Sequence, residues 1–324
     1  MENIAVINIT SFGREFPEHI EELEKKIGPV TKMQLSAETS GLELAEILAD
    51  YQYVLLGNYP FFNEDFFRHN TSVKLIARHG IGINNIDVNA AHAYNVVVTN
   101  MPNSIEVDAV AEQALSLLSA LAKNVLVARQ MVASGEWNSH RERIMGVQLS
   151  HATTGIIGFG NIGKRFAEIM KYGFNNRILV YDPNISENDI TSFGALKCSL
   201  NELLENSDFI SLHASLNDDT YHLIDYQAIS RIRSHTILVN TGRGDLVDED
   251  AIFEAIQNRH LFGYGADVMH IEPAYANHPL LHSDHVIITP HSAIYNLTCM
   301  KAMNRKVMDD IYRVSEHKEP VNKL

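Results

Sequence analysis

The stretch Thr154–Pro183 limits the fold of this chain more than any other part of the sequence. Three glycines, Gly158, Gly160 and Gly163, follow a short apolar run in G-x-G-x-x-G spacing, and a helical apolar pattern comes directly after them. In a strand, turn and helix of this kind, the first glycine takes backbone dihedrals that other residues resist. The second lets a pyrophosphate approach the main chain, and the third lets the helix pack closely on the strand.

The helix N-terminus and a second strand complete this pattern. The free amides of Asn161 and Ile162 would face the pyrophosphate, helped by the helix dipole. The second strand, Arg177–Tyr181, ends at Asp182, where a carboxylate accepts hydrogen bonds from both adenosine ribose hydroxyls and repels a 2′-phosphate. A glycine-rich turn without a ligand is the alternative, but the register of strand, helix, second strand and acid favours a cofactor. The sequence therefore predicts NAD rather than NADP.

Length and composition set wider limits. At 324 residues and 45% hydrophobic residues, the chain is long enough for about two globular domains. The net charge of -14 argues against nucleic acid and anionic membrane as partners. Cys198 and Cys299 are too few for a disulfide framework or a zinc module, and no run of about 18 apolar residues occurs. We therefore expect a cytoplasmic protein.

Strand-like and helix-like segments alternate in the first hundred residues, which is typical of a small open α/β domain. A strand expected at 74–78 leads into Gly80, Ile81 and Gly82, whose backbone amides would lie at a strand end, where a carboxylate could bind. An ordinary glycine turn is an equal alternative there. From Asn103 to Ser134 the apolar stripe predicts one long helix, capped by Asn103 and leading from one domain to the next.

Four further strands follow the glycine motif. They are expected at Asp208–His213, Thr236–Asn240, Tyr264–Val268 and Val286–Thr289, with helical segments between them. Each of these strands ends in or is followed by polar residues. Because the carboxyl ends of parallel strands meet at one edge of a sheet, these polar residues can converge although they are far apart in sequence.

The motifs between about Lys74 and Ile294 resemble those of the D-isomer-specific 2-hydroxyacid dehydrogenase family. In order they read KLIARHGIGINNID, DAVAEQAL, GEWN, GIIGFGNIG, YDP, SLHASLNDDTYHLI, LVNTGRGDLVDEDAI, GADVMHIEP, HPL and VIITPHSA. The resemblance implies an α/β protein of two open doubly wound domains. A Rossmann-type NAD-binding domain at residues 102–294 would be inserted into a flavodoxin-like substrate domain at residues 1–101 and 295–324. It also implies a homodimer.

The same resemblance marks Arg243, Glu272 and His291 as catalytic residues. Reduction of a 2-keto acid to a D-2-hydroxy acid needs a proton donor for the carbonyl oxygen, and an imidazolium at His291 is suited to that near neutral pH. Glu272, hydrogen-bonded to the other ring nitrogen, would orient the ring and favour its protonated form. Arg243 would hold the substrate carboxylate and polarise the carbonyl.

Further residues are implied along the cofactor and the substrate. Those along NAD, beyond the glycine motif, are Ala214, Thr241, Gly242 and Asp267. Asp267 would hold the nicotinamide carboxamide, and Ile81 and Gly82 would offer amides to the substrate carboxylate.

The substrate side chain is less constrained. The segment Leu56–Tyr59 has no cation where phosphoglycerate-using members carry arginines, so we expect an uncharged 2-keto acid side chain. Tyr59, His79 and Tyr295 are the candidate pocket walls.

Three alternatives remain on the sequence alone. The spacing of His278, His282 and His285 suggests a metal site, but the first belongs to the HPL turn and the redox chemistry needs no metal. A formate-type dehydrogenase would lack the glutamate partner that Glu272 provides. An NAD-sensing binding protein of the corepressor kind would keep the same fold and the same three catalytic residues.

Overall fold

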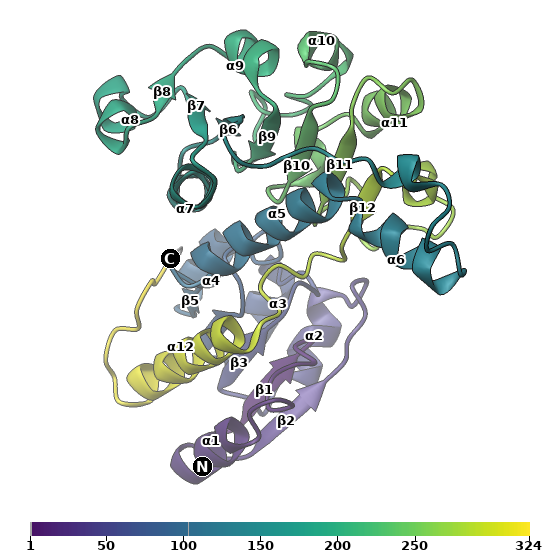
Figure 1. Ribbon diagram of the computed structural model, residues 1–324. Helices are drawn as coiled ribbons and strands as arrows, with labels where there is room; N and C mark the ends of the chain where they lie inside the picture. The colour runs from purple at the N-terminus through teal and green to yellow at the C-terminus, as the bar shows by residue number, and fades with distance from the viewer. Residues whose placement is uncertain (1, 103) are drawn as a thin grey trace. The chain divides into compact units, whose positions relative to one another are not determined.

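The computed structural model describes residues 2–102 and 104–324. The chain divides into two compact units, one made of Met1–Ile105 with Tyr295–Leu324 and the other of Glu106–Ile294. Each unit has its own parallel β-sheet with helices on both faces (Figure 1).

The first unit holds a five-stranded parallel sheet in the order β2-β1-β3-β4-β5. Its strands are β1 (Ile4–Ile7), β2 (Val30–Met33), β3 (Tyr53–Leu56), β4 (Leu75–Arg78) and β5 (Val97–Thr99). This is the flavodoxin-like strand order. The three central strands are buried along their whole length, as expected where helices cover both faces of a sheet.

Among the described residues, five helices cover this sheet. They are α1 (Glu18–Lys26), α2 (Gly41–Ile47), α3 (Glu64–His69), α4 (Val88–Ala93) and α12 (Leu297–Ser315). The helix α12 comes from the far end of the chain and is fastened here by a buried polar contact. Asp310 accepts hydrogen bonds from Thr99 Oγ1 and from Lys306 Nζ, each at 2.6 Å, and its side chain is almost fully buried. The C-terminal helix therefore belongs to the first unit.

The second unit holds a seven-stranded parallel sheet in the order β12-β11-β10-β9-β6-β7-β8. Its strands are β6 (Thr153–Ile157), β7 (Arg177–Tyr181), β8 (Leu196–Lys197), β9 (Phe209–Leu212), β10 (Ile237–Asn240), β11 (Gly263–Ala266) and β12 (Val286–Ile288). This is the Rossmann order with one further strand. The order reverses beside β6, so the glycine turn that follows β6 stands at the topological switch point, where ligands of such sheets bind.

The helices of the second unit lie on both faces of its sheet, except for α6, which packs beside α5 (Figure 1). They are α5 (Val107–Ala122), α6 (Val125–Ala133), α7 (Asn161–Glu168), α8 (Glu187–Phe193), α9 (Leu200–Asn206), α10 (Tyr226–Arg231) and α11 (Glu249–Gln257). Short turns are η1 (Arg141–Ile144), η2 (Ile169–Gly173), η3 (Gly244–Leu246) and η4 (Pro279–His282).

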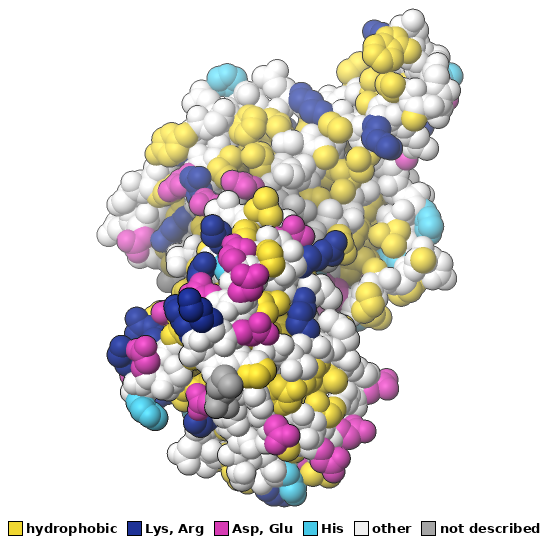
Figure 2. Space-filling view, turned by 90° about the horizontal axis from the view of Figure 1, so that it is seen from below, with side chains coloured by type: hydrophobic (Ala, Val, Ile, Leu, Met, Phe, Trp, Pro, Cys, Tyr) yellow, Lys and Arg dark blue, Asp and Glu magenta, His cyan; other side chains and the backbone are white. Residues whose placement is uncertain are grey.

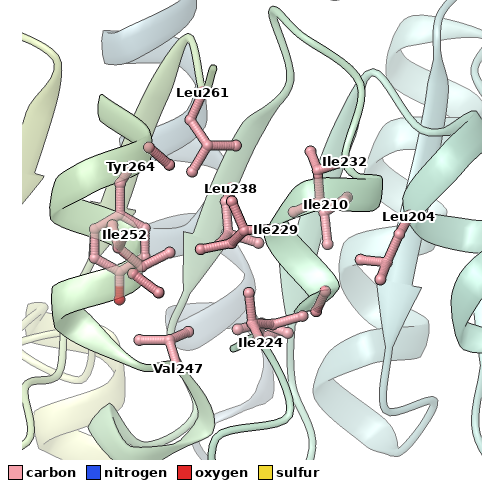
Figure 3. Close-up of a cluster of buried hydrophobic side chains, with 14 of the residues drawn as sticks. Leu204, Ile210, Ile224, Ile229, Ile232, Leu238, Val247, Ile252, Leu261 and Tyr264 are labelled. Carbon is pink, nitrogen blue, oxygen red and sulfur yellow. The ribbon is translucent and has the colours of Figure 1, made fainter. Parts of the chain in front are cut away.

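Two hydrophobic clusters fix this sheet between its helices. In the first, Leu204 of α9, Ile229 of α10 and Ile252 of α11 pack with Ile210 and Leu238 of the sheet (Figure 3). The second cluster lies on the opposite face and includes buried side chains of α5 and α7. Burial of each such side chain contributes about 1.5–3 kcal/mol, so the strand ends that carry polar residues are held on a stable frame.

The structure confirms the predicted fold class, two doubly wound α/β sheets of Rossmann and flavodoxin-like order. The strand predicted at Arg177–Tyr181 is confirmed to the residue. The single helix predicted at 103–134 is wrong, because α5 ends at Ala122 and α6 begins at Val125. Asn124 takes a left-handed conformation between them, with φ of 49°, and its side chain donates to the Met145 carbonyl at 3.1 Å. The N-cap predicted at Asn103 lies outside the described residues.

Within the described part of the chain, no single helix has the length and apolarity to cross a membrane. The helices α5 and α6 meet that test only when taken together, and a bend of 56° separates them.

Candidate functional site

The glycine turn after β6 is shaped by three different local demands. Gly158 has φ of +90°, and a Cβ atom there would lie 2.5 Å from the Ala214 nitrogen. A Cβ atom on Gly163 would lie 2.0 Å from the Gly158 oxygen. At Gly160, by contrast, a Cβ atom would meet nothing within 4 Å. The first and third glycines are therefore required by the fold itself, whereas the second leaves open space at the main chain.

Among the residues that the structure describes, the first amides of α7 donate to no acceptor, and they lie beside that open space. Gly160 is the N-cap and has no side chain to accept from them. The first backbone hydrogen bond of the helix runs from Lys164 N to Gly160 O at 2.9 Å. The amides of Asn161 and Ile162 precede it, as required for a phosphate site at a helix N-terminus.

Asp182, at the end of β7, lies directly beside this turn. Its Oδ2 accepts from the Phe159 backbone N–H at 2.8 Å, and its Oδ1 accepts from the Asn184 N–H at 2.9 Å. Each carboxylate oxygen keeps a second lone pair for a further donor. The open main chain at Gly160, the free amides and this fixed carboxylate together fit a dinucleotide with free ribose hydroxyls, as in NAD.

A half-buried histidine that the sequence analysis did not single out lies next to the turn. The His213 ring contacts Ser211 Oγ at 2.9 Å and Thr241 Oγ1 at 3.4 Å, and its own backbone N–H donates to Ile157 O at 2.8 Å. Burial lowers the pKa of His213 to about 3, so the ring is neutral. The signal in the sequence is a histidine at the end of the mostly apolar predicted strand Asp208–His213, and that position alone does not show whether the ring is shielded from water.

The predicted acid and its carboxylate partner are in direct contact. His291 Nδ1 lies 2.7 Å from Glu272 Oε2, and both side chains are partly exposed, at 45% and 39%. The hydrogen bond to Glu272 raises the pKa of His291 against the opposing effects of burial and of Arg243. Burial raises the pKa of Glu272, but hydrogen bonds from His291 and from the Met269 N–H outweigh it, so the net pKa is lowered. The pair therefore favours a protonated ring facing an ionised carboxylate.

The loop that carries His291 is held by a buried carboxylate. Asp267, 2% exposed, accepts hydrogen bonds from the Thr289 hydroxyl, the Ser292 N–H at 2.9 Å and the Ala293 N–H at 2.8 Å. The three donor residues lie on either side of His291 in sequence. Their hydrogen bonds therefore fix its backbone, whose φ is 51°. In this structure Asp267 positions the loop, and its role toward a nicotinamide carboxamide stays a prediction.

Arg243 is exposed at the end of β10. Its Nη1 donates to Gly242 O at 2.7 Å, and its own carbonyl accepts from Asn240 Nδ2 at 2.8 Å. Its charge is close enough to lower the pKa of both His291 and Glu272. The structure thus brings the three predicted catalytic residues together at neighbouring strand ends of one sheet.

The substrate residues predicted in the first unit lie after β4. The Ile81 carbonyl accepts from Asn100 Nδ2 at 2.7 Å, which fixes the turn. Within the described residues, the N–H groups of Ile81 and Gly82 donate to no protein acceptor. Those amides are therefore available to an anion.

The three candidate pocket walls differ in exposure. Tyr59 and Tyr295 are exposed, whereas His79 is buried with its Nε2 2.9 Å from Asn304 Oδ1. Burial lowers the pKa of His79 to about 4.

No group of three histidine, cysteine or acidic side chains that could hold a metal is found among the described residues. His278, the first residue of the spacing that suggested a metal, contacts Glu249 Oε2 at 3.1 Å instead.

Residues 115–293 match the family described as D-isomer specific 2-hydroxyacid dehydrogenase, NAD binding domain. A glyoxylate reductase of Korarchaeum cryptofilum is 34% identical over 260 residues, which cover 80% of this chain and 78% of that protein.

A D-3-phosphoglycerate dehydrogenase of Methanocaldococcus jannaschii is 33% identical over 91% of this chain, which spans only 55% of that protein. Among solved structures, the TT0316 protein of Thermus thermophilus superposes with a TM-score of 0.87 over the full length of both chains, at 26% identity.

Proposed function

Because the chain belongs to the D-isomer-specific 2-hydroxyacid dehydrogenase family, we propose that it is an NAD-dependent oxidoreductase that interconverts a 2-keto acid and a D-2-hydroxy acid. The observation that carries this proposal is the contact between His291 and Glu272 at 2.7 Å, beside the charge of Arg243. NADH, when bound, supplies the hydride that reaches C2 of the keto acid. The protein supplies the binding groups and the proton.

His291 is the acid in the direction of reduction. Its Nε2 proton passes to the carbonyl oxygen of the substrate, which becomes the hydroxyl, and the ring is left neutral. In the reverse direction the neutral ring takes the hydroxyl proton. Glu272 favours the charged ring and holds Nδ1, so Nε2 is the nitrogen left to face the substrate.

Arg243 binds the substrate carboxylate and polarises the carbonyl. In the first unit, the amides of Ile81 and Gly82 are the proposed donors to a carboxylate. The fixed charge of a guanidinium and its fork of donors support this role. If it is right, Arg243→Lys weakens keto-acid binding while NADH affinity is unchanged. A variant in which only NADH affinity changed would contradict the assignment.

NAD is held by the amides of Asn161 and Ile162, by the main chain at Gly160 and by the Asp182 carboxylate. Ala214, Thr241 and Gly242 line the remainder of the site. The carboxylate supports a preference for NADH over NADPH, because a 2′-phosphate would be repelled there.

The substrate is an unphosphorylated 2-keto acid. The turn after β3 supports this choice, because its residues Gly57, Asn58 and Tyr59 include no cation. The nearby guanidinium of Arg78 is buried and already donates to the His79 carbonyl at 2.8 Å and to Asn58. Nothing in the site favours the corepressor alternative over catalysis.

A homodimer is the proposed assembly. The segment formed by α6 and the residues up to Met145 exposes large apolar side chains, including Trp137 at 68% and Met145 at 74%. Hydrophobic side chains gather on the segment at the upper right of Figure 2, where Figure 1 has α6 and the residues after it. Light scattering should give twice the chain mass for the wild type. Trp137→Ser should lower that mass, whereas Tyr226→Ser, at an exposed aromatic on α10, should not.

We place this enzyme in the cytoplasm, supported by its two free cysteines. Cell fractionation tests the location. The activity is tested by NADH oxidation against 2-keto acids that include glyoxylate, hydroxypyruvate, pyruvate, phenylpyruvate and 3-phosphohydroxypyruvate, with NADPH in parallel. Turnover of an unphosphorylated acid with NADH supports the proposal. Tight NADH binding without any turnover would contradict it.

A further inference from the structure

A second pair of a histidine and an acid lies beside the proposed catalytic residues. His270 Nδ1 is hydrogen-bonded to Asp245 Oδ1, although 25 positions separate the two residues in sequence. Asp245 comes two residues after Arg243, and His270 comes two residues before Glu272. The pair therefore joins the loop that carries the proposed substrate arginine to the loop that carries the proposed partner of His291.

The two loops are in close backbone contact at the same place. A Cβ atom on Gly244 would lie 2.1 Å from the Met269 carbonyl carbon and 2.3 Å from the His270 nitrogen. Glu249, at the start of α11, accepts the His270 N–H at 2.9 Å, and its other oxygen lies 3.1 Å from His278 Nε2. The backbone of His270 is thus fixed by a largely buried carboxylate, and its side chain is fixed by Asp245.

Glu272 depends on this same segment. Its Oε1 accepts from the Met269 N–H at 3.0 Å, and its Oε2 contacts His291 at 2.7 Å. A shift of the Met269–His270 backbone would therefore move the carboxylate away from the His291 ring. A displacement of about 1 Å at such a contact is enough to lower a rate substantially.

We propose that His270 and Asp245 are a positioning pair, which holds the segment bearing Glu272 against the loop bearing Arg243 and so keeps Glu272 in register with His291. The expected effect of this pair on the reaction rate rests on the proposed function, whereas its effect on the position of Glu272 does not. Neither residue touches the reacting atoms.

The charges around His270 agree with this role. The groups that face it are both acidic, Asp245 from η3 and Glu249 from α11, and the hydrogen bond to Asp245 raises the pKa of His270. The pair is partly exposed, with 53% of the His270 side chain accessible, so it acts by geometry more than by the free energy of an exposed ion pair.

The first test is an NMR titration of the histidine rings in the full chain without substrate. The His291 signal is assigned by its loss in His291→Gln. In His270→Ala and in Asp245→Ala, His291 should titrate at lower pH than in the wild type, because Glu272 no longer holds it as well. In the variant that carries both substitutions, His291 should titrate at the same pH as in either single variant. The control is Arg231→Ala, which removes an exposed ion pair between Arg231 of α10 and Glu205 of α9. It should leave the His291 titration unchanged.

Two results would overturn the proposal. One is an unchanged His291 titration in His270→Ala that unfolds at the wild-type temperature. The other is a double variant whose shift is the sum of the two single shifts. If His270→Ala does not fold, His270→Gln replaces it, because glutamine keeps a side-chain donor for Asp245. In that variant the proposal predicts that His291 titrates at a pH between the values for the wild type and for Asp245→Ala.

Kinetics separates this proposal from the proposed function. In the alanine variants kcat should fall roughly threefold to tenfold, with KM for the keto acid and the NADH dissociation constant unchanged. A wild type without turnover would remove the proposed function while the NMR titration still decides the pairing. If the alanine variants keep wild-type turnover and an unchanged His291 titration, only the positioning role of His270 and Asp245 is contradicted.

Discussion

His291 Nδ1 and Glu272 Oε2 lie 2.7 Å apart, although the two residues are 19 positions apart in sequence. His291 follows β12 and Glu272 follows β11, and these strands are parallel neighbours in the sheet. The contact arises because carboxyl ends of adjacent parallel strands share one edge. It also makes the protonation of one residue depend on the charge of the other.

Glu272→Gln should move the pH dependence of the reaction. If His291 is the proton donor, as proposed, keto-acid reduction needs its protonated ring, so the rate falls as pH rises through a pKa that Glu272 raises. With the carboxylate gone, that pKa falls and the alkaline limb moves to lower pH. Near neutral pH, kcat/KM should drop roughly tenfold. The measurement is kcat/KM against pH for both proteins, and superimposable profiles would contradict the role given to Glu272.

His291→Ala should abolish most of the turnover and spare the cofactor. Loss of a general acid lowers kcat by roughly 10²–10⁴-fold. The NADH dissociation constant, measured by fluorescence titration, should stay at the wild-type value, because the residues proposed to hold the dinucleotide follow other strands. Near wild-type turnover in this variant would show that the proton comes from another group.

Gly158→Ala and Gly160→Ala form a matched pair with opposite expected effects. At Gly158 the φ of +90° and the approach to Ala214 leave no room for a methyl group, so roughly 1–3 kcal/mol of unfolding free energy should be lost. At Gly160 a methyl group meets only open space, so the unfolding free energy should stay within about 0.5 kcal/mol of the wild type.

The same pair differs in cofactor binding. In Gly160→Ala the folded protein should bind NADH at least roughly tenfold more weakly, because the methyl group occupies the approach of the pyrophosphate. Urea unfolding of both variants tests the predicted changes in unfolding free energy, and NADH titration of both tests the predicted change in cofactor affinity. Wild-type NADH affinity in Gly160→Ala would show that the pyrophosphate does not pass over this residue.

Both units should lose stability in acid through histidines whose pKa is lowered in the folded chain, such as His79 in the first unit and His213 in the second. Burial lowers the pKa of His79 to about 4 and of His213 to about 3, from 6.5. Below pH 6.5 the unfolded chain binds protons at these sites that the folded chain does not, so stability falls until the pH passes the lower value. The slope is at most about 1.4 kcal/mol per pH unit for each histidine.

Urea unfolding across that acid range checks the slope. His79→Gln should reduce it, because glutamine can still donate to Asn304 but does not titrate. An unchanged slope in this variant would mean that His79 is not neutral in the folded chain.

Much of the second sheet was predictable because its evidence is local. The glycine motif, the strand Arg177–Tyr181 and the acid that ends it follow one another within thirty residues, each with a stereochemical reason. The strand ends at Asn240 and Ala266 were close to prediction, since both strands are buried along their whole length.

Other features depend on contacts that no local pattern shows. The helix break at Asn124 is fixed by a hydrogen bond to Met145, 21 residues away, while the apolar stripe runs on through it. The edge strands β2 and β8 were missed because they are short and only partly buried. The contact of Asp245 with His270 could not be predicted from the sequence either, because it depends on β10 and β11 being neighbours in the sheet.

The most direct test of the central claim follows the hydrogen itself. NADH deuterated at the transferable position of the nicotinamide is incubated with the enzyme and the best unphosphorylated 2-keto acid, and the product is analysed by chiral chromatography and mass spectrometry. The account predicts a 2-hydroxy acid of the D configuration with deuterium at C2. Product of the L configuration, or product without deuterium, would contradict it.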